Sequence, residues 1–526
     1  MMTADVPRWT AHELTFESGE SWADPFWDVD LAVELTSPSG QRTTVDAFWD
    51  GGSTWRARVR PDDVGEWSWR TVGAAGTATG LAGRSGSFQC VPYVGPNPVY
   101  RHGPVRIAAD GHSLAHADGT PFLWLGDTAW NGLIRASDAD WNDYLGTRRA
   151  QGYSVIQFFS THWRALAGDP AGEPAYTEQG GFRVNPRFYQ RLDPKVAAIA
   201  DHGLLASAIV VLSLYEDEPG WAWPAEQLVR FARWLRARWG AYHVAWTLGG
   251  DGDFSGQRAE RWYPIGEAVY GVPPEALVTM HPRGRCWVGD EFRDQAWLTF
   301  LVYQSGHSAD EALVRWLPEG PHTRAWQEEP ARPIISIEPN YEDHPSFGTG
   351  ERFTAAEVRR ASYWSLLVTP PAGVTYGHFS LWAWADTPEL VGDAIRNQPE
   401  YTLEPWWSVL DTPGVRSMTL LRHYFASGPW WNLRPAQALL TTQPGDQDAR
   451  TFIAAARTPA GDWTVVYLPV GAAAVDLRLE ADPSASARWF DPRTGYWSPA
   501  FAVSGTKGQM TFVAPSKDDW VLDIRQ

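Results

Sequence analysis

The stretch His243–Asp253, HVAWTLGGDGD, carries the pattern that decides the fold. Its apolar run Val244–Leu248 is short and is followed by three glycines and two acids. A short apolar run that is bounded by glycines indicates a buried strand, and such runs alternating with helical segments indicate a parallel sheet. The same arrangement recurs along residues 105–425.

Eight runs of this kind predict eight strands, the number that a (β/α)8 TIM barrel requires. The predicted strands are Phe122–Leu125, Val155–Phe159, Leu204–Leu212, Val244–Leu248, Ala276–Met280, Leu298–Tyr303, Pro333–Ile337 and Val374–Phe379. Between them, the apolar residues of Leu228–Trp239 recur with helical spacing, and Gly240 is a candidate stop. Thr354 and Glu357 have the spacing of a capping box at the start of another helix.

The two ends of the chain follow a different rule. Trp55, Ala57 and Val59 alternate with polar residues, which is the period of a half-buried strand. The last hundred residues return to the same alternation. We therefore predict an α/β protein in which a barrel at residues 105–425 is flanked by β-sandwiches at residues 1–97 and 430–526. The proline-rich residues 92–104 are the expected linker.

Composition narrows the classes of function. The 526 residues include 44 Lys and Arg against 62 Asp and Glu, which gives a net charge of -18. We expect neither a nucleic-acid partner nor an anionic membrane surface, because both require clustered cations. The 32 tryptophans favour carbohydrate chemistry, since indole faces stack on sugars, although most must serve the core. The oligomeric state is left open.

Cysteines and the N-terminus suggest a compartment. Two cysteines, Cys90 and Cys286, can form neither a disulfide framework nor a cysteine-rich zinc motif. The sequence MMTADVPRW has no basic region followed by an apolar region, as a secretory signal would. No apolar stretch approaches the ~20 residues of a membrane span. We therefore expect a cytoplasmic protein.

Catalytic groups of a barrel lie where its strands end. Asp251 follows the fourth run and Glu338 follows the seventh, so their side chains can converge across the barrel mouth. Glycoside hydrolysis uses two carboxyl groups in this way, one as an acid and the other as a nucleophile or base. The structural alternative is that Asp251 caps the next helix and Glu338 forms a salt bridge at the rim.

Other polar and aromatic residues near the strand ends are candidate substrate contacts. They are Asp127, Trp130, Gln157, His162, Trp163, His281, Gln304, His307, Tyr341, Tyr376 and Trp382, with Trp384 as a further stacking candidate. Asp127 could instead cap the following loop. A single histidine is as often structural as functional, and about half of these candidate tryptophans should belong to the core.

Seven motifs resemble the successive strand ends of the apiosidase-like (DUF4038) barrel, a glycoside hydrolase family. The motifs are FLWLGDTAW, AQGYSVIQFF, HVAWTLGGDGD, TMHP, YQSGH, EPNYE and GVTYGHFSLW. Residues 8–90 resemble the DUF5060 sandwich that precedes such barrels. Residues 451–500 resemble a collagen-binding-like sandwich, from which we carry over no collagen binding.

The resemblance implies Asp251 as the general acid/base and Glu338 as the nucleophile, with Asp253 and Glu342 ranked second. It implies a retaining, exo-acting glycosidase that removes a terminal pentofuranosyl residue and needs no cofactor or metal. One rival is a non-catalytic carbohydrate-binding protein on a degenerate barrel. The other is a metal-dependent hydrolase that uses Asp127, His281, His307 and Glu338.

Overall fold

Eight parallel strands form the centre of the molecule, at the eight positions that the sequence predicts. The structure is a computed structural model that describes residues 5–73, 80–163, 166–271, 276–391, 401–479, 485–503 and 508–526. The strands are β12 (Trp124–Thr128), β13 (Val155–Phe159), β16 (Leu205–Leu212), β17 (Val244–Gly250), β18 (Val278–Thr279), β19 (Leu301–Gln304), β20 (Ile334–Glu338) and β21 (Gly373–Tyr376).

The strands follow the order β18-β17-β16-β13-β12-β21-β20-β19, which nearly closes a barrel. Hydrogen bonds beyond the regular ladder bring the two ends of this sheet together. The amide of Thr299 donates to the carbonyl of Val278 at 2.9 Å, and the Thr279 hydroxyl donates to the carbonyl of Phe300 at 2.8 Å. The predicted (β/α)8 TIM barrel is thereby confirmed.

Side chains fill the barrel at both ends. At the amino ends of the strands, Trp124, Val155 and Ile335 belong to one apolar cluster. A small sheet of β9 (Val105–Ile107), β10 (Leu114–His116) and β11 (Pro121–Phe122) adds residues to this cluster and covers that end. A second, mainly aromatic cluster lies at the carboxyl ends. The mouth therefore opens at the end where the sequence places its polar motifs.

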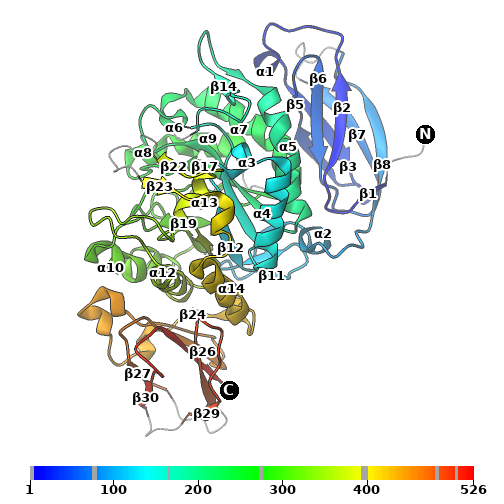
Figure 1. Cartoon of the computed structure of the whole chain (residues 1–526). Coiled ribbons are helices and arrows are strands. Elements are labelled where there is room, and N and C mark those ends of the chain that lie inside the picture. Colours follow the sequence, from blue (N-terminus) through cyan, green and yellow to red (C-terminus); the bar gives the residue numbers. More distant parts are fainter. Residues whose placement is uncertain are drawn as a thin grey trace.

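Helices cover the outside of the barrel (Figure 1). They are α3 (Gly132–Arg135), α4 (Asp138–Ala150), α5 (Pro186–Asp201), α6 (Pro219–Ala222), α7 (Ala225–Trp239), α8 (Gln257–Glu260), α9 (Trp262–Tyr270), α10 (Glu311–Glu319), α11 (His322–Ala325), α12 (Ala355–Leu367), α13 (Phe379–Ala383) and α14 (Pro413–Phe425). Gly240 caps α7, and the capping box of Thr354 and Glu357 opens α12, as predicted. Within the described ranges, no helix has the length and apolar character to cross a membrane.

The N-terminal residues form two facing sheets, one in the order β1-β8-β7-β3-β4 and one in the order β2-β6-β5. Their elements are β1 (Asp5–Pro7), β2 (His12–Glu17), α1 (Pro25–Asp28), β3 (Leu31–Thr36), β4 (Arg42–Asp46), β5 (Phe48–Trp49), β6 (Thr54–Val59), β7 (Gly65–Gly73) and β8 (Ser85–Val91), followed by α2 (Pro98–His102). Trp55, Ala57 and Val59 enter the core between the sheets, as their alternation predicts.

The opposite face of β6 docks on the barrel beside α5 and α7 (Figure 1). Arg58 on that face donates to the buried carboxylate of Asp193 at 2.6 Å. Arg238 donates to the same carboxylate at 2.8 and 2.7 Å, and Trp239 donates its indole N–H at 2.8 Å. The arginine face of this strand is thus an internal interface, although its polar pattern alone suggests solvent.

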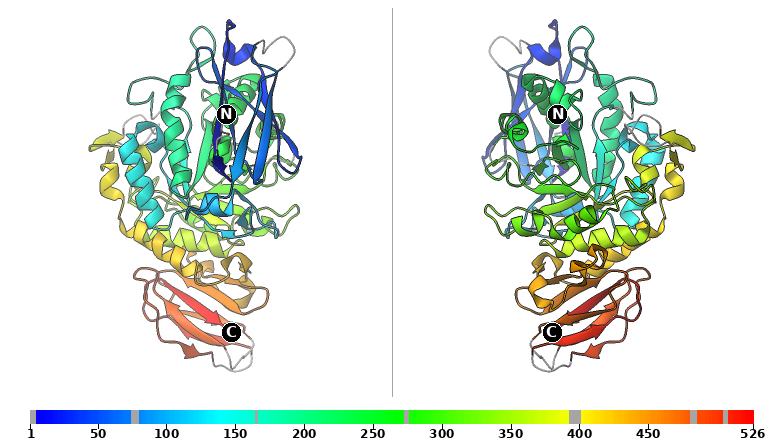
Figure 2. Two further views of the ribbon diagram at one scale, coloured as in Figure 1. Left: turned by 90° about the vertical axis from the view of Figure 1, so that its right-hand side faces the viewer. Right: turned by 90° about the vertical axis from the view of Figure 1, so that its left-hand side faces the viewer.

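The C-terminal residues form a six-stranded sheet in the order β24-β25-β26-β31-β28-β29 and a separate pair, β27 and β30. The strands are β24 (Arg434–Pro435), β25 (Ala454–Arg457), β26 (Trp463–Leu468), β27 (Ala474–Leu477), β28 (Ser486–Phe490), β29 (Phe501–Ala502), β30 (Met510–Val513) and β31 (Trp520–Arg525). Figure 2 shows this domain below the barrel, next to its last helices.

Both faces of β26 are buried, for two different reasons. Trp463, Val465 and Tyr467 pack into the cluster of the barrel, whereas Val466 and Leu468 pack inside the sandwich. Arg359 of α12 adds a bidentate ion pair with Asp519, at 2.7 and 2.9 Å. The sandwich therefore shares an apolar core and a buried charge pair with the barrel.

The Asp193 cluster should be a main stabiliser of the N-terminal interface. Burial alone would raise the pKa of Asp193, but the guanidinium groups of Arg238 and Arg58 lower it. We expect Asp193→Asn to cost about 3–5 kcal/mol, because it leaves two buried cations underneutralised. Thermal unfolding of the variant should show a clearly lower midpoint.

The matched control is Asp30→Asn, which breaks the pair of Arg230 with an exposed carboxylate and should cost about 1 kcal/mol or less. A carboxylate with a lowered folded pKa stabilises above its unfolded pKa of about 3.9 and loses that contribution as pH falls through the folded value. The difference in thermal midpoint between wild type and Asp193→Asn should therefore shrink only at acidic pH. Equal midpoint shifts for both variants would contradict the assignment.

Candidate active site

Glu338, the last residue of β20, lies between two imidazole rings. Its Oε1 is 3.0 Å from His307 Nε2, and its Oε2 is 3.4 Å from His281 Nε2. The Glu338 side chain is 11% exposed, so the carboxylate is almost removed from solvent but still reachable. The sequence predicts the two histidines as ligands of substrate hydroxyls, whereas in the structure both face Glu338.

The electrostatics of this group follow from burial. Burial raises the pKa of Glu338, while His281 and the Tyr341 hydroxyl act in the opposite direction. Burial also lowers the pKa of His281, and it lowers the pKa of His307 to about 3. Both rings are therefore neutral near pH 7. His307 can donate an Nε2–H to Glu338 without cancelling the negative charge of the carboxylate.

Asp251 follows β17 directly and has a left-handed backbone, with φ of 54°. Aspartate tolerates this conformation better than most residues. The preceding Gly250 is required for packing, because a Cβ there would lie 2.6 Å from Ile209 Cγ2. After this turn, Gly252 pairs with Pro282, so the chain continues beside the segment that follows β18.

Gln304 links the two acids. Its Nε2 donates a hydrogen bond to Asp251 Oδ1, and Gln304 is the register partner of Glu338 where the β19–β20 pairing shifts. Asp251 and Glu338 therefore belong to one site, with Gln304 between them. The sequence places Gln304 at the mouth. In the structure its side chain contacts Asp251, and its backbone lies beside Glu338.

An aromatic wall lies beside the two acids. Trp130 packs on His281, with ring centroids 6.0 Å apart and an interplanar angle of 28°, and it also contacts Phe159 at 4.8 Å. Trp163 contacts both Phe159, at 4.7 Å, and Trp382, at 5.9 Å. Four predicted aromatic contacts therefore gather in one cluster: Trp130, Trp163, Tyr341 and Trp382.

Gln157 lies deeper, inside the barrel on the inward face of β13. It is fully buried, and its amide nitrogen is 3.5 Å from the carbonyl of Ile337. Its Oε1 has no hydrogen-bond partner among the described residues. It is therefore a buried polar group next to the strand that carries Glu338.

Asp127 is not at the mouth, so its predicted contact with substrate is wrong. Its carboxylate accepts from Arg148 Nε at 2.5 Å and from the Tyr144 hydroxyl at 2.7 Å, and all three side chains are fully buried. Both partners belong to α4, on the outside of the barrel. Asp127 therefore attaches a helix to the sheet.

Tyr376 also points outward from the barrel. Its predicted role as a substrate contact is therefore wrong, as it is for Asp127. Its hydroxyl donates to Glu342 Oε2 at 2.6 Å. Glu342 further accepts from the Thr412 hydroxyl at 2.5 Å and from the amide of Gly414 at 2.8 Å. Glu342, the second-ranked nucleophile, is thus fully engaged in holding the start of α14.

Three further candidate residues contact partners other than Glu338. Asp253, the second-ranked acid, pairs with Arg283 at 2.8 Å and accepts from the Ser255 hydroxyl at 2.6 Å. His162 accepts the amide of Ala175 at 3.1 Å and packs on Tyr176, and burial lowers its pKa to about 4. Trp384 is fully buried and stacks on Trp406 at 4.5 Å, so it serves the core.

The sequence does not identify two residues that belong to the site. His344 stacks on His307 with centroids 4.1 Å apart, and its Nδ1 lies 2.7 Å from the carbonyl of Pro345. Asn131 accepts the indole N–H of Trp163 at 2.7 Å. Asn131 directly follows the motif FLWLGDTAW, but only the fold shows which side chains it meets.

The ligand set of the metal-dependent rival does not come together. His281 and His307 meet at Glu338, but Asp127 is bound to Arg148 on the other side of the sheet. Among the residues that the structure describes, no group of three or more His, Cys, Asp or Glu has the arrangement of a metal site.

Comparison with known families agrees with this arrangement. Residues 108–432 match the family model described as "Apiosidase-like, catalytic domain". The chain belongs to the apiosidase-like family. Residues 5–73 match DUF5060, a domain of unknown function, and residues 434–524 match Collagen_bind_2. The chain is thus a glycoside hydrolase whose barrel carries the family's catalytic domain.

Solved structures agree with the fold of this apiosidase-like chain. A candidate glycoside hydrolase from Bacteroides vulgatus is 19% identical, with 99% of each chain covered and a TM-score of 0.73. A glycoside hydrolase family 5 protein from the same species is 21% identical, with 81% of this chain and 94% of that chain covered and a TM-score of 0.69. No curated protein matches the sequence.

The placement of Glu342 leads to a specific expectation. Glu342→Gln removes the charge that accepts three hydrogen bonds at the start of α14, so the thermal midpoint should fall. The substitution should leave kcat of the folded enzyme within about threefold of wild type. Tyr376→Phe, which deletes one of the three donors, should show a smaller midpoint shift of the same kind. A large loss of kcat with an unchanged thermal midpoint would show that Glu342 takes part in the reaction.

Proposed function

We propose that this apiosidase-like enzyme is a retaining, exo-acting glycosidase. It removes a terminal pentofuranosyl residue, apiosyl or arabinofuranosyl, from an oligosaccharide or plant glycoside. The observation that carries the proposal is the placement of Asp251 and Glu338 next to Gln304, at the ends of three strands. A buried carboxylate and a more accessible one at the mouth of a barrel are the two groups that glycoside hydrolysis requires.

In the first step, Glu338 attacks the anomeric carbon while protonated Asp251 gives its proton to the departing glycosidic oxygen. The carbon–oxygen bond to the leaving group breaks, and an ester between the sugar and Glu338 forms. In the second step, Asp251 takes a proton from water, and the water oxygen displaces Glu338. The sugar leaves with its original anomeric configuration, and both carboxyl groups return to their starting states.

The imidazoles beside Glu338 suit a nucleophile. A cation such as arginine would hold the carboxylate strongly and lower its reactivity. A neutral His307 instead fixes the orientation of the carboxylate with one N–H, and the charge remains available for attack. Asp251 is only partly buried, so its proton can exchange with solvent between the two steps.

The small exposed area of the aromatic wall favours a small terminal sugar. Trp130 is 6% exposed and Trp382 is 5% exposed, so the aromatic wall presents only a small area to a ligand. Such a wall can contact the C–H face of one sugar ring next to Glu338. So small an exposed aromatic area suits contact with one terminal sugar better than with a chain of sugars, which supports exo action.

A panel of aryl pentosides and hexosides, including apiosides and arabinofuranosides, tests the proposal when the anomer of the first product is followed by NMR. We expect the fastest release from a pentofuranoside, with retention. An inverted first product would contradict the double-displacement pathway. Undiminished turnover in EDTA is expected, and a loss that added metal restores would favour the metal-dependent rival.

The same panel assigns the two acids. Asp251→Asn should lower kcat by about 10²–10⁴, with the smallest loss for aryl groups that leave without protonation. Glu338→Gln should lower kcat by several orders of magnitude for every aglycone. The matched control Asp253→Asn should stay close to wild type, because Arg283 and Ser255 hold that carboxylate away from the reaction. Wild-type activity in Glu338→Gln would contradict the mechanism.

His307 should set the acidic limb of the pH profile. Its N–H stabilises the charged form of Glu338, so His307→Leu should raise the pKa of Glu338 further and move the acidic limb of kcat/KM to higher pH. A hydrogen bond to a charged group contributes about 1.5–3 kcal/mol, so kcat/KM should fall roughly 10- to 150-fold.

His307→Gln, whose amide can donate from a similar position, should recover part of both effects. Equal pH profiles for wild type and His307→Leu, measured on proteins with equal thermal midpoints, would show that His307 has no influence on the nucleophile.

A further inference from the structure

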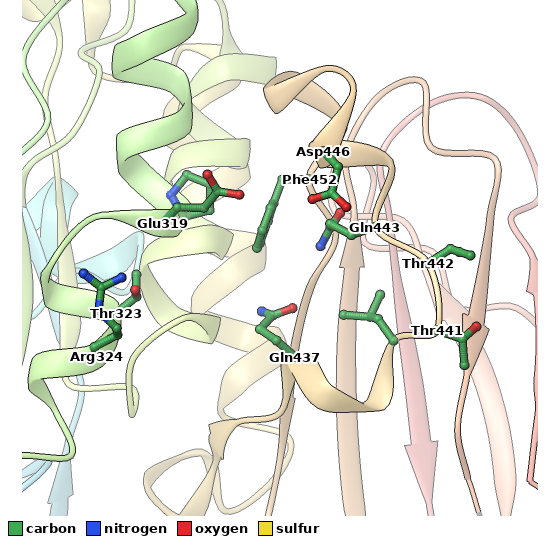
Figure 3. Close-up of a pocket in the computed structure, with 11 residues that line it drawn as sticks. Glu319, Thr323, Arg324, Gln437, Thr441, Thr442, Gln443, Asp446 and Phe452 are labelled. Carbon is green, nitrogen blue, oxygen red and sulfur yellow. The ribbon is translucent and has the colours of Figure 1, made fainter.

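A hollow lies where the barrel meets the C-terminal sandwich (Figure 3). Its volume is about 460 Å³, within the usual range of small-molecule sites of roughly 300–1,000 Å³. It is lined by Pro318, Glu319, Thr323, Arg324, Gln437, Leu440, Thr441, Thr442, Gln443, Asp446 and Phe452. We call this hollow the junction groove.

The junction groove has two walls from different domains. Figure 3 shows Glu319, Thr323 and Arg324 on the side of the barrel, and Thr442 and Asp446 on the side of the sandwich. Further hydrogen bonds hold both walls in place. The Thr323 hydroxyl donates to the carbonyl of Gly320 at 2.8 Å, and Gln443 Nε2 donates to the carbonyl of Ile453 at 2.9 Å. The groove is thus formed before any ligand arrives.

Three side chains in the groove have hydrogen-bonding capacity to spare. Arg324, Thr442 and Asp446 are exposed, and within the described part of the chain their side chains make no hydrogen bond or ion pair. Together they offer a guanidinium, a hydroxyl and a carboxylate from both walls. The hydroxyl of Thr323, already donating to Gly320, can still accept a further hydrogen bond.

The chemistry of the lining favours a neutral sugar. Hydroxyl, amide and charged groups alternate with the apolar surfaces of Pro318, Leu440 and Phe452, and carbohydrates likewise alternate hydroxyl groups with C–H faces. The charged groups are two carboxylates and one guanidinium, so the groove carries a small negative excess. The net charge of -18 on the whole chain adds to the repulsion of anionic polymers.

The junction groove lies apart from Glu338. Helix α10 begins at Glu311, four residues after His307, and reaches the groove at Pro318 and Glu319. A nine-residue helix is about 13 Å long, so the groove lies about one helix length below the barrel mouth. A molecule in the groove cannot be the sugar that is being cleaved.

We propose that the junction groove binds a neutral oligosaccharide segment of the substrate, at a distance from the bond that is cleaved. The proposal rests on the proposed function for its choice of substrate. The enzyme removes terminal residues one at a time, and a second contact keeps it on the same glycan between turnovers. Such a contact raises the effective concentration of side-chain termini near Glu338 without any change at the catalytic centre.

Binding is tested first, in a chain that does not turn over. The full chain with Glu338→Gln is run in native gels that contain soluble arabinan, arabinoxylan or galactomannan. We expect retardation by at least one of these neutral polymers. Adding Arg324→Ala, Thr442→Val and Asp446→Ala should weaken that affinity about tenfold or more, because three polar contacts are lost. Equal thermal midpoints confirm that the exposed substitutions leave the fold intact.

The matched control adds Arg187→Ala and Asp290→Ala, an exposed cation and an exposed anion elsewhere on the barrel, and should keep full retardation. In the active chain, the triple groove variant should keep kcat/KM for an aryl glycoside within about twofold of wild type while losing activity on the retarding polymer. Absence of retardation by all three polymers, or equal retardation of the triple variant, would overturn the proposal. Because binding needs no turnover, loss of retardation in the triple variant supports the groove even if no glycoside is hydrolysed.

Discussion

The buried carboxylate of Glu338, held between two neutral imidazoles, is the constraint on which the functional architecture depends. Taking a carboxylate out of water is costly unless donors replace the lost hydration. His307 supplies one such donor at 3.0 Å, and the His281 ring lies 3.4 Å from the other carboxylate oxygen. The shift in β19–β20 pairing sets Gln304 opposite Glu338, and Gln304 reaches Asp251. One local irregularity of the sheet therefore joins both acids.

The flanking sandwiches are attached to the barrel by buried carboxylates whose lost hydration is likewise replaced by hydrogen-bond donors. Asp193 accepts hydrogen bonds from one arginine of the sandwich and one of α7, and Asp519 accepts hydrogen bonds from Arg359 of α12. Each carboxylate is buried, and each is matched by cations across a domain boundary. Breaking such a pair is expensive because the remaining charge stays buried. The three domains thus share packed interfaces, and one of these forms the junction groove.

Much of this structure could be read from the sequence, and the misses have two causes. The eight apolar runs mark the strands because strands that are buried on both faces read as continuous apolar stretches. Asp127 and Tyr376 were placed at the mouth by their position along the chain alone. Their strands alternate, so Asp127 shares the outward face of Leu125 and Tyr376 that of Val374. The contacts of Glu342 with Thr412 and Gly414, and the stacking of His344 on His307, join distant segments, and no local pattern carries them.

The central claim is that Glu338 forms a bond with the sugar. The most direct measurement is peptide mass spectrometry after brief exposure of the enzyme to a 2-fluoro pentofuranosyl donor with a good leaving group, which slows the second step more than the first. The account predicts one added sugar, located on the peptide that contains Glu338 and absent when Glu338 is replaced by Gln. A label on Asp251, Asp253 or Glu342 instead of Glu338 would contradict the account. So would rapid turnover of the donor without any labelled enzyme.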